Sequence, residues 1–171
     1  MRRHSLLLSA RSLAPAVILL ALVAHAPAAN SAQADKILIV KSTRTMTLFH
    51  GDKVLKSYKV ALGGVPVGPK RMEGDHKTPE GDYIIDSRNQ HSQFHLALRI
   101  SYPSPADRER ARRLGARPGG WIMIHGLPAG FSDRDPLVRT DWTDGCVAVT
   151  NAEIEEIWNL VPVGTRVEIR P

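Results

Sequence analysis

Apolar residues from residue 36 onward recur in short runs separated by turn residues, a pattern typical of β-strands. Residues 36–40 are apolar after the first position and predict a buried strand. Residues 45–49 and 54–62 alternate loosely on either side of the turn at 50–52, so they predict a hairpin. Four further strands are predicted, at residues 82–86, 94–102, 121–125 and 165–169.

A first helix is predicted from residue 105 to residue 113 or 114. Ser104 suits the cap, Pro105 suits the first helical position and Asp107 places an acid in the first turn. The helix has little apolar content, so it is expected on the surface, with its arginines in solvent.

A second helix is predicted after Thr150, which forms a capping box with Glu153. Its apolar residues fall on one stripe and are expected in the core: Ile154, Ile157, Trp158 and Val161.

Hairpin-length links dominate, and strands do not alternate regularly with helices. The pattern therefore predicts a mainly β fold, an antiparallel β-sandwich or barrel with two short helices.

Residues 1–34 have the composition of a secretory signal peptide. A basic start precedes an apolar run at 14–23 that is too short to span a membrane comfortably, and small residues offer cleavage after Ala28 or Ala34. An uncleaved anchor is the alternative. Residues 35–171 are then expected to form a single, exported domain. Membrane contact is expected only through the signal peptide before cleavage.

The charge balance argues against a nucleic-acid partner. The whole chain has 23 basic and 17 acidic residues and a formal charge of +6. Removing residues 1–34 takes away three arginines and no acids, which leaves 20 against 17, or +3. Nucleic-acid binding usually needs a stronger, clustered basic surface.

Histidines are numerous, but no metal or cofactor is predicted. His91 and His95 have a spacing that suits zinc on a helix, whereas along a strand it spans about 13 Å, too wide for one ion. A metal-dependent peptidase using His76, His91 and His95 stays as an alternative. Residues 70–79 are charged and expected to be exposed, with His76 facing solvent or substrate.

Cys146 is the only cysteine of the chain. It cannot form an internal disulfide, so in an exported protein its thiol is free or pairs with another molecule. A free thiol here is either a buried, inert group or a reactive one. His125 ends a predicted strand upstream, and a polar loop of about 15 residues separates the two. Cys146 is therefore predicted as a nucleophile, His125 as its base and Gly145 as the residue that lets backbone N–H groups approach the oxyanion. A carboxylate or a backbone carbonyl would orient the imidazole.

Four neighbours of this pair are candidate substrate-binding residues. Thr143 is either a hydrogen-bond donor to substrate or part of a turn. Asp144 either binds a substrate amine or caps a turn. Trp142 is a cleft wall or a core residue. Arg139, like Arg134, offers a guanidinium for a substrate carboxylate, unless it is only solvated.

Three motifs carry a resemblance to a known family: His125-Gly126, Thr143-Asp144-Gly145-Cys146-Val147 and Thr78-Pro79-Glu80-Gly81-Asp82-Tyr83. With them, residues 36–169 resemble the L,D-transpeptidase catalytic domain, also called the YkuD domain. Residues 141–151 are similar to its YafK-type branch. The resemblance implies a β-sandwich, secretion across the inner membrane into the periplasm or cell wall, and a cysteine enzyme acting on peptidoglycan stem peptides. The cysteine attacks the carbonyl of the third stem residue and expels the terminal D-alanine, and the acyl group passes to an amine or to water.

The chain departs from the family pattern at three positions. Thr143 takes the place of a serine, Asp144 replaces a basic residue, and Ala148 replaces an arginine, which removes a fixed cation near the thiolate. Transpeptidation in wall cross-linking, remodelling and cell shape is the leading expectation. The alternatives are a hydrolase that releases wall-linked protein or peptide, and a catalytically silent wall-binding module. A wall-linked protein is accordingly a second candidate partner.

Overall fold

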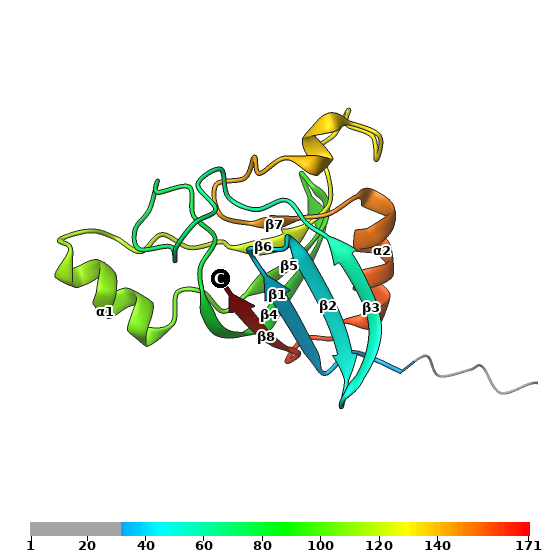
Figure 1. The fold of residues 1–171 in the computed structure, drawn as a ribbon, viewed down its shortest axis with the longest axis horizontal. Helices are drawn as coiled ribbons and strands as arrows, with labels where there is room; N and C mark the ends of the chain where they lie inside the picture. The colour runs from blue at the N-terminus through cyan, green and yellow to red at the C-terminus, as the bar shows by residue number, and fades with distance from the viewer. Residues whose placement is uncertain (1–31) are drawn as a thin grey trace, which may run out of the picture. The chain divides into compact units, whose positions relative to one another are not determined.

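Eight β-strands and two α-helices make up residues 32–171, the part of the chain that the computed structural model describes (Figure 1). In chain order the strands are β1 (Lys36–Val40), β2 (Thr45–His50), β3 (Lys53–Lys59), β4 (Gly81–Ser92), β5 (His95–Ile100), β6 (Met123–His125), β7 (Val147–Ala148) and β8 (Arg166–Arg170). The helices are α1 (Pro105–Arg113) and α2 (Asn151–Leu160), with a 3-10 turn, η1 (Pro136–Arg139). The predicted signal peptide lies outside the described residues, except for its last three positions.

The strands form one sheet in the order β3-β2-β1-β8-β4-β5-β6-β7. The pairs β1–β8 and β6–β7 are parallel, and the others are antiparallel. The predicted mainly β fold with two helices is confirmed, but the sheet is mixed rather than purely antiparallel. Parallel neighbours need long crossover connections, and local sequence patterns do not reveal which strands such connections bring together.

The two edges of this sheet meet. Ala61 follows β3 at one edge and Ala148 lies in β7 at the other, and each backbone N–H donates to the other's carbonyl at 2.9 Å. A second bridge joins Gly63 to Thr143. A sheet whose edges pair must curve, so the strands form a partial barrel without two open edges at this end. This closure lies where the loop that carries Cys146 returns to the sheet.

Alternate residues of the central strands build the core, as expected for strands with one buried face. The fully buried strand positions include Ile37, Ile39, Met46, Leu48, Val167 and Ile169. Helix α2 adds Ile154 and Ile157 to the same cluster and begins at the predicted capping box. The Thr150 side chain accepts a hydrogen bond from the Glu153 amide at 3.2 Å, and the Glu153 carboxylate accepts one from the Thr150 amide at 2.9 Å.

Two strands differ from the sequence-based prediction. β4 continues to Ser92 instead of ending at residue 86, because its polar second half pairs with β5 across register shifts that local apolar alternation does not show. β7 is two residues long and was not predicted. Neither helix of residues 32–171 is long and apolar enough to cross a membrane.

Candidate active site

His125 and Cys146 lie on or next to two neighbouring strands. His125 ends β6, and Cys146 directly precedes β7. The two strands are neighbours (Figure 1) and run parallel, with His125 opposite Ala148. Continuing this register by one residue towards the start of β7 places Cys146 opposite Met123. Side chains alternate between the faces of a strand, so the imidazole and the thiol project from the same face as diagonal neighbours.

The thiol of Cys146 is held at the start of β6. It donates a hydrogen bond to the Trp121 carbonyl at 3.6 Å, and the Met123 backbone N–H points to the sulfur. Burial raises the pKa of the Cys146 thiol, and Asp144 raises it further, whereas the Met123 amide and the Lys70 ammonium act to lower it. The net effect keeps the resting group protonated, so the sulfur would need a base to accept its proton in order to act as a nucleophile.

His125 has the tautomer that a general base needs. Its Nδ1 lies 2.7 Å from the carbonyl oxygen of Gly126. A carbonyl only accepts hydrogen bonds, so Nδ1 carries the proton in the neutral ring and the Nε2 lone pair remains free. The ring is 3% exposed, and burial lowers the pKa of His125 despite an opposing effect of the Gly126 carbonyl. The neutral, proton-accepting form therefore prevails near pH 7, and the orienting group is a backbone carbonyl.

Two aromatic side chains enclose the imidazole. The ring centroid of His125 lies 4.5 Å from that of Phe94 and 5.8 Å from that of Trp142. The two aromatic rings are themselves 6.0 Å apart. Trp142 is thus a wall of the histidine pocket, and its buried Nε1 has no hydrogen-bond partner among the described residues. An unsatisfied buried donor costs about 1–3 kcal/mol.

Thr143 and Gly145 shape the turn that precedes the cysteine. The Thr143 hydroxyl donates to the Cys146 carbonyl at 2.8 Å and accepts from the Gly145 amide at 3.1 Å, which is a turn role. Gly145 has φ +126°, and a Cβ at this position would lie 2.5 Å from the Lys77 carbonyl oxygen. Glycine is required here because the backbone of another loop lies against it.

The charged candidates near Cys146 are Asp144, Arg134 and Arg139, and their surroundings differ. Asp144 is exposed, and its Oδ1 lies 2.7 Å from Nδ1 of His76. Arg134 is also exposed. The backbone of Arg139 belongs to η1, and its side chain is outside what the structure describes. Substrate contacts of Asp144 and Arg139 therefore remain predictions.

Sequence reasoning missed an anchor at the start of the Cys146 turn. Oδ1 of Asp141 accepts the Leu62 amide at 2.9 Å, and its Oδ2 accepts two N–H groups of Arg44 at 2.7 and 3.2 Å. Arg44 lies at the start of the β2 hairpin, 97 residues away in sequence. Because the partners are far apart along the chain, no local pattern signals this bond.

The expectation that residues 70–79 are exposed is wrong for three of them, since Lys70, Thr78 and Pro79 are buried. Lys70 is 4% exposed and Thr78 is fully buried. The Lys70 ammonium lies 2.8 Å from Oδ1 of Asp75, and the Thr78 hydroxyl accepts the Gly63 amide at 2.9 Å. A charged run with turn residues reads as surface, but here tertiary partners compensate the burial of its polar groups.

Trp121 is an exposed aromatic residue in a strained conformation next to the thiol. It is 70% exposed and has φ +56°, a backbone region that bulky residues rarely adopt. The guanidinium of Arg99 lies 5.1 Å from its ring centroid and is itself held by Asp86 at 2.8 Å. Backbone strain of this kind clusters at functional sites.

Histidines away from Cys146 do not assemble a metal site. Within residues 32–171, no three His, Cys, Asp or Glu side chains are grouped so that they could hold a metal ion. His91 and His95 lie on either side of the β4–β5 turn, and His95 pairs with Glu155 at 2.7 Å. The described histidines thus give the metal-dependent alternative no support.

Comparison with known proteins identifies the family to which the chain belongs. The sequence model of the YkuD family, the L,D-transpeptidase catalytic domain, matches residues 34–169. The chain therefore belongs to the L,D-transpeptidase catalytic domain family.

Three relatives illustrate the relationship. The chain is 33% identical over 132 residues to the Escherichia coli K12 protein named "Putative L,D-transpeptidase YafK", covering 73% of this chain and 46% of that one. The helical cell shape determining protein Pgp2 of Campylobacter jejuni has 25% identity and a TM-score of 0.61, over 81% of this chain and 48% of that chain. An L,D-transpeptidase of Xylanimonas cellulosilytica, 17% identical with a TM-score of 0.51 over 85% and 64%, shares the fold. The chain spans about half the length of YafK and Pgp2.

Proposed function

We propose that this protein is an exported cysteine L,D-transpeptidase that acts on peptidoglycan stem peptides in wall cross-linking or remodelling. The observation that carries the proposal is the parallel register of β6 and β7, which projects Cys146 and His125 from one face. The Gly126 carbonyl supports it, because it binds the N–H of Nδ1 and leaves Nε2 to accept a proton.

The first half-reaction forms a thioester. His125 Nε2 takes the thiol proton as the sulfur of Cys146 attacks the carbonyl carbon of the third stem residue. Backbone amides around Gly145 stabilise the oxyanion. The C–N bond then breaks, and the imidazolium returns its proton to the amine of the leaving D-alanine. The acyl group remains on sulfur.

The second half-reaction releases the enzyme. An amine of another stem peptide or of a wall-linked protein attacks the thioester carbonyl, and His125 accepts its proton. The C–S bond breaks, and the sulfur recovers a proton from the imidazolium. We assign Trp142 as the wall that fixes the imidazole, Thr143 as the support of the turn, and Asp144 and Arg139 as contacts for charged groups of the two peptides.

Hydrolysis of the thioester by water is the second candidate. The observation that favours it is Ala148, which is neutral and 2% exposed where the family pattern has an arginine. Product analysis by mass spectrometry separates the two after the protein is incubated with a disaccharide-tetrapeptide. Transpeptidation gives cross-linked dimers with release of D-alanine, and hydrolysis gives only trimmed monomers.

The remaining alternatives have their own signatures in the same assay. A silent wall-binding module binds the muropeptide and leaves it intact, and its Cys146 resists iodoacetamide under native conditions. A metal-dependent peptidase keeps its activity in Cys146→Ala and loses it to a chelator. We expect the reverse, with no product from Cys146→Ala and unchanged activity with the chelator.

Export through cleavage after Ala28, the earlier of the two predicted sites, fits the structure better than cleavage after Ala34. Ala34 is 2% exposed, its amide donates to the Leu160 carbonyl at 2.8 Å, and its carbonyl accepts the Thr165 hydroxyl at 3.1 Å. Cleavage after Ala34 would remove these contacts. The intact mass of the secreted protein tests this proposal, since a chain starting at Asp35 would contradict it.

A further inference from the structure

We propose that Lys70 is a positioning residue of the Cys146 site: its buried ammonium is the fixed cation that holds the negative charge forming on the sulfur. The inference rests on the proposed function for its purpose, because a stabilised sulfur anion matters only if Cys146 reacts. It names a residue outside the family motifs that pointed to the site.

The ammonium of Lys70 is buried with spare hydrogen-bonding capacity. Lys70 is 4% exposed, and its Nζ donates to Oδ1 of Asp75 at 2.8 Å. An ammonium group carries three N–H donors, and this is the one acceptor it has among residues 32–171. Burying a cation with so few acceptors is costly, so a second negative or polar group at this place would stabilise it.

Asp75, the counter-ion, is already shared among other donors. Its carboxylate also accepts the backbone amides of Arg71 at 2.6 Å, Met72 at 3.1 Å and Lys77 at 3.2 Å. Burial acts to raise the pKa of Asp75, but Lys70 and these three amides hold it below its usual range. Its negative charge is thus spread over four donors, and the charge of Lys70 is incompletely neutralised at the pair.

The Lys70–Asp75 segment is locked onto the turn of the cysteine. The Lys77 amide is bound to Asp75, and the carbonyl of the same residue lies against Gly145, at 2.5 Å from where a Cβ would be. Gly145 precedes Cys146. This series of contacts fixes the ammonium relative to the turn that carries the sulfur. After the Met123 amide, Lys70 is the second group that acts to lower the pKa of Cys146.

The other groups near the sulfur do not supply a positive charge that would stabilise the thiolate, which leaves Lys70 to do so. Asp144 disfavours the thiolate and is paired with His76. His125 is held neutral by burial at rest. Position 148, where the family pattern places an arginine, is a buried alanine. Lys70, from a different loop, supplies the missing positive charge.

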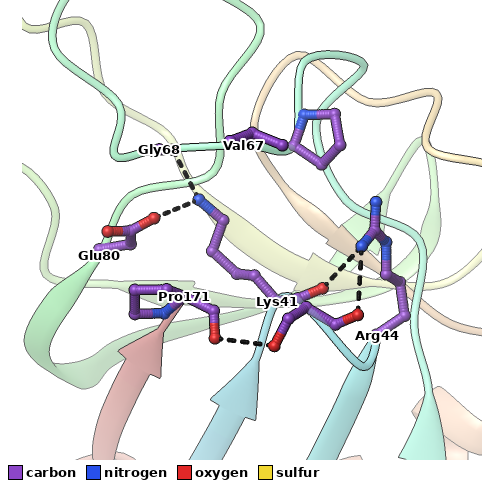
Figure 2. Close-up of a pocket in the computed structure, with 8 residues that line it drawn as sticks. Lys41, Arg44, Val67, Gly68, Glu80 and Pro171 are labelled. Atoms are coloured by element: carbon purple, nitrogen blue, oxygen red, sulfur yellow. Dashed lines mark hydrogen bonds and ion pairs between the residues drawn. The ribbon is translucent and has the colours of Figure 1, made fainter.

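Lys41 provides a matched control because it is an equally buried lysine with a structural role. It is 2% exposed, and its Nζ donates to the Gly68 carbonyl at 2.7 Å, the Thr78 carbonyl at 3.1 Å and the Glu80 carboxylate at 2.8 Å. Figure 2 shows Lys41 directed towards Gly68 and Glu80. All three donors are used, and the cavity of about 150 Å³ that Lys41 lines includes neither Cys146 nor His125.

The test is the pH dependence of iodoacetamide alkylation at Cys146. We expect the ionisation midpoint of the thiol to rise in Lys70→Met, because the substitution removes a cation whose charge acts to lower the pKa of Cys146. Lys70→Arg should keep the wild-type midpoint, and Lys41→Met should keep it even where it lowers thermal stability. A purely structural role would not move the midpoint in this charge-dependent way.

An unchanged midpoint in folded Lys70→Met, or an equal rise in Lys41→Met, would overturn the inference. If Lys70→Met does not fold, Lys70→Gln replaces it, because the amide still donates to Asp75 without a charge, and the same outcomes apply. Alkylation needs no peptide substrate. A shifted midpoint in a protein that acylates nothing would contradict the proposed function alone, and an unchanged one in an active enzyme would contradict only this inference.

Discussion

The two loops that flank Cys146 are held in place in opposite ways. The β3–β4 loop, residues 60–80, buries charged and polar groups such as Lys70 and Thr78 and receives three hydrogen bonds or ion pairs from Lys41. The outer part of the β6–β7 loop, residues 128–136, is largely exposed. Within it, Asp133 accepts a hydrogen bond from the amide of Asn151, the first residue of α2, at 2.8 Å.

We expect this difference to correspond to different roles of the two loops next to Cys146. A loop that buries paired charges is costly to perturb. The β3–β4 loop also lies against the turn that carries Cys146, through Lys77 and Gly145. An exposed loop can change without loss of the fold. We expect the β3–β4 loop to govern the reactivity of Cys146 and the outer β6–β7 loop to tolerate substitution. Paired substitutions in the two loops test this assignment.

The largest stability difference is expected between two aspartates. Asp75→Asn leaves the Lys70 ammonium buried without its counter-ion and should lower the free energy of unfolding by about 3–5 kcal/mol. Asp133→Asn removes a negative charge at an exposed site but keeps a carbonyl oxygen for the Asn151 amide, so it should change the free energy of unfolding little. Urea unfolding monitored by circular dichroism measures both. Equal effects would remove the distinction between the loops.

The pH dependence of the same pair has a defined sign. The folded-state pKa of Asp75 lies below its ordinary value of 3.8, so its contribution to stability is present above pH 3.8 and is lost as the pH falls through the folded-state pKa. Wild-type stability should therefore fall more steeply than that of Asp75→Asn below pH 3.8. Parallel curves would show that Asp75 is not held ionised by its partners.

A glycine pair gives the next largest effect. Gly145→Ala places a Cβ 2.5 Å from the Lys77 carbonyl oxygen at φ +126° and should cost about 2–4 kcal/mol, with loss of activity. Gly130→Ala, in the exposed loop, has φ +90° but nothing within 4 Å, so it should cost about 1 kcal/mol and leave turnover intact. Thermal unfolding and D-alanine release report both quantities. An active Gly145→Ala enzyme would contradict the tight contact.

The burial of His125 predicts the pH below which its imidazole is protonated and can no longer accept the thiol proton during acylation. Burial lowers the pKa of His125 from an ordinary value of 6.5, so the neutral form persists to a lower pH. The acid limb of the acylation rate should therefore have its midpoint below pH 6.5. Single-turnover rates between pH 4 and 8 measure it, with circular dichroism as the control for folding. A midpoint above 6.5 would mean that an anion stabilises the imidazolium.

The smallest effect is expected at the exposed Asp144. Its charge raises the pKa of the Cys146 thiol, so Asp144→Asn should increase the alkylation rate at neutral pH by a few-fold at most. Stability should hardly change, because the His76 pair is exposed. His76→Gln, which leaves Asp144 unpaired, should act in the opposite direction. A rate decrease in Asp144→Asn would show that the carboxylate positions the thiol.

Local patterns predicted the elements whose determinants are local. The apolar run at 36–40 gave β1, and the signals at Ser104 and Thr150 gave the two capped helices. The nucleophile candidate followed from a solitary thiol beside a glycine. What local patterns missed depends on contacts between distant segments, such as the edge closure at Ala61 and Ala148 and the burial of Lys70. A lysine in a charged run looks solvated until the fold places Asp75 beside it.

The most direct measurement is the intact mass of the protein after incubation with a carbapenem, which acylates a reactive nucleophile by ring opening. The wild-type protein is expected to gain one carbapenem mass, Cys146→Ala none, and His125→Ala the same mass at a rate about 10²–10⁴-fold lower. An adduct that persists in folded Cys146→Ala would contradict Cys146 as the nucleophile. A wild-type rate in His125→Ala would contradict the imidazole as its base.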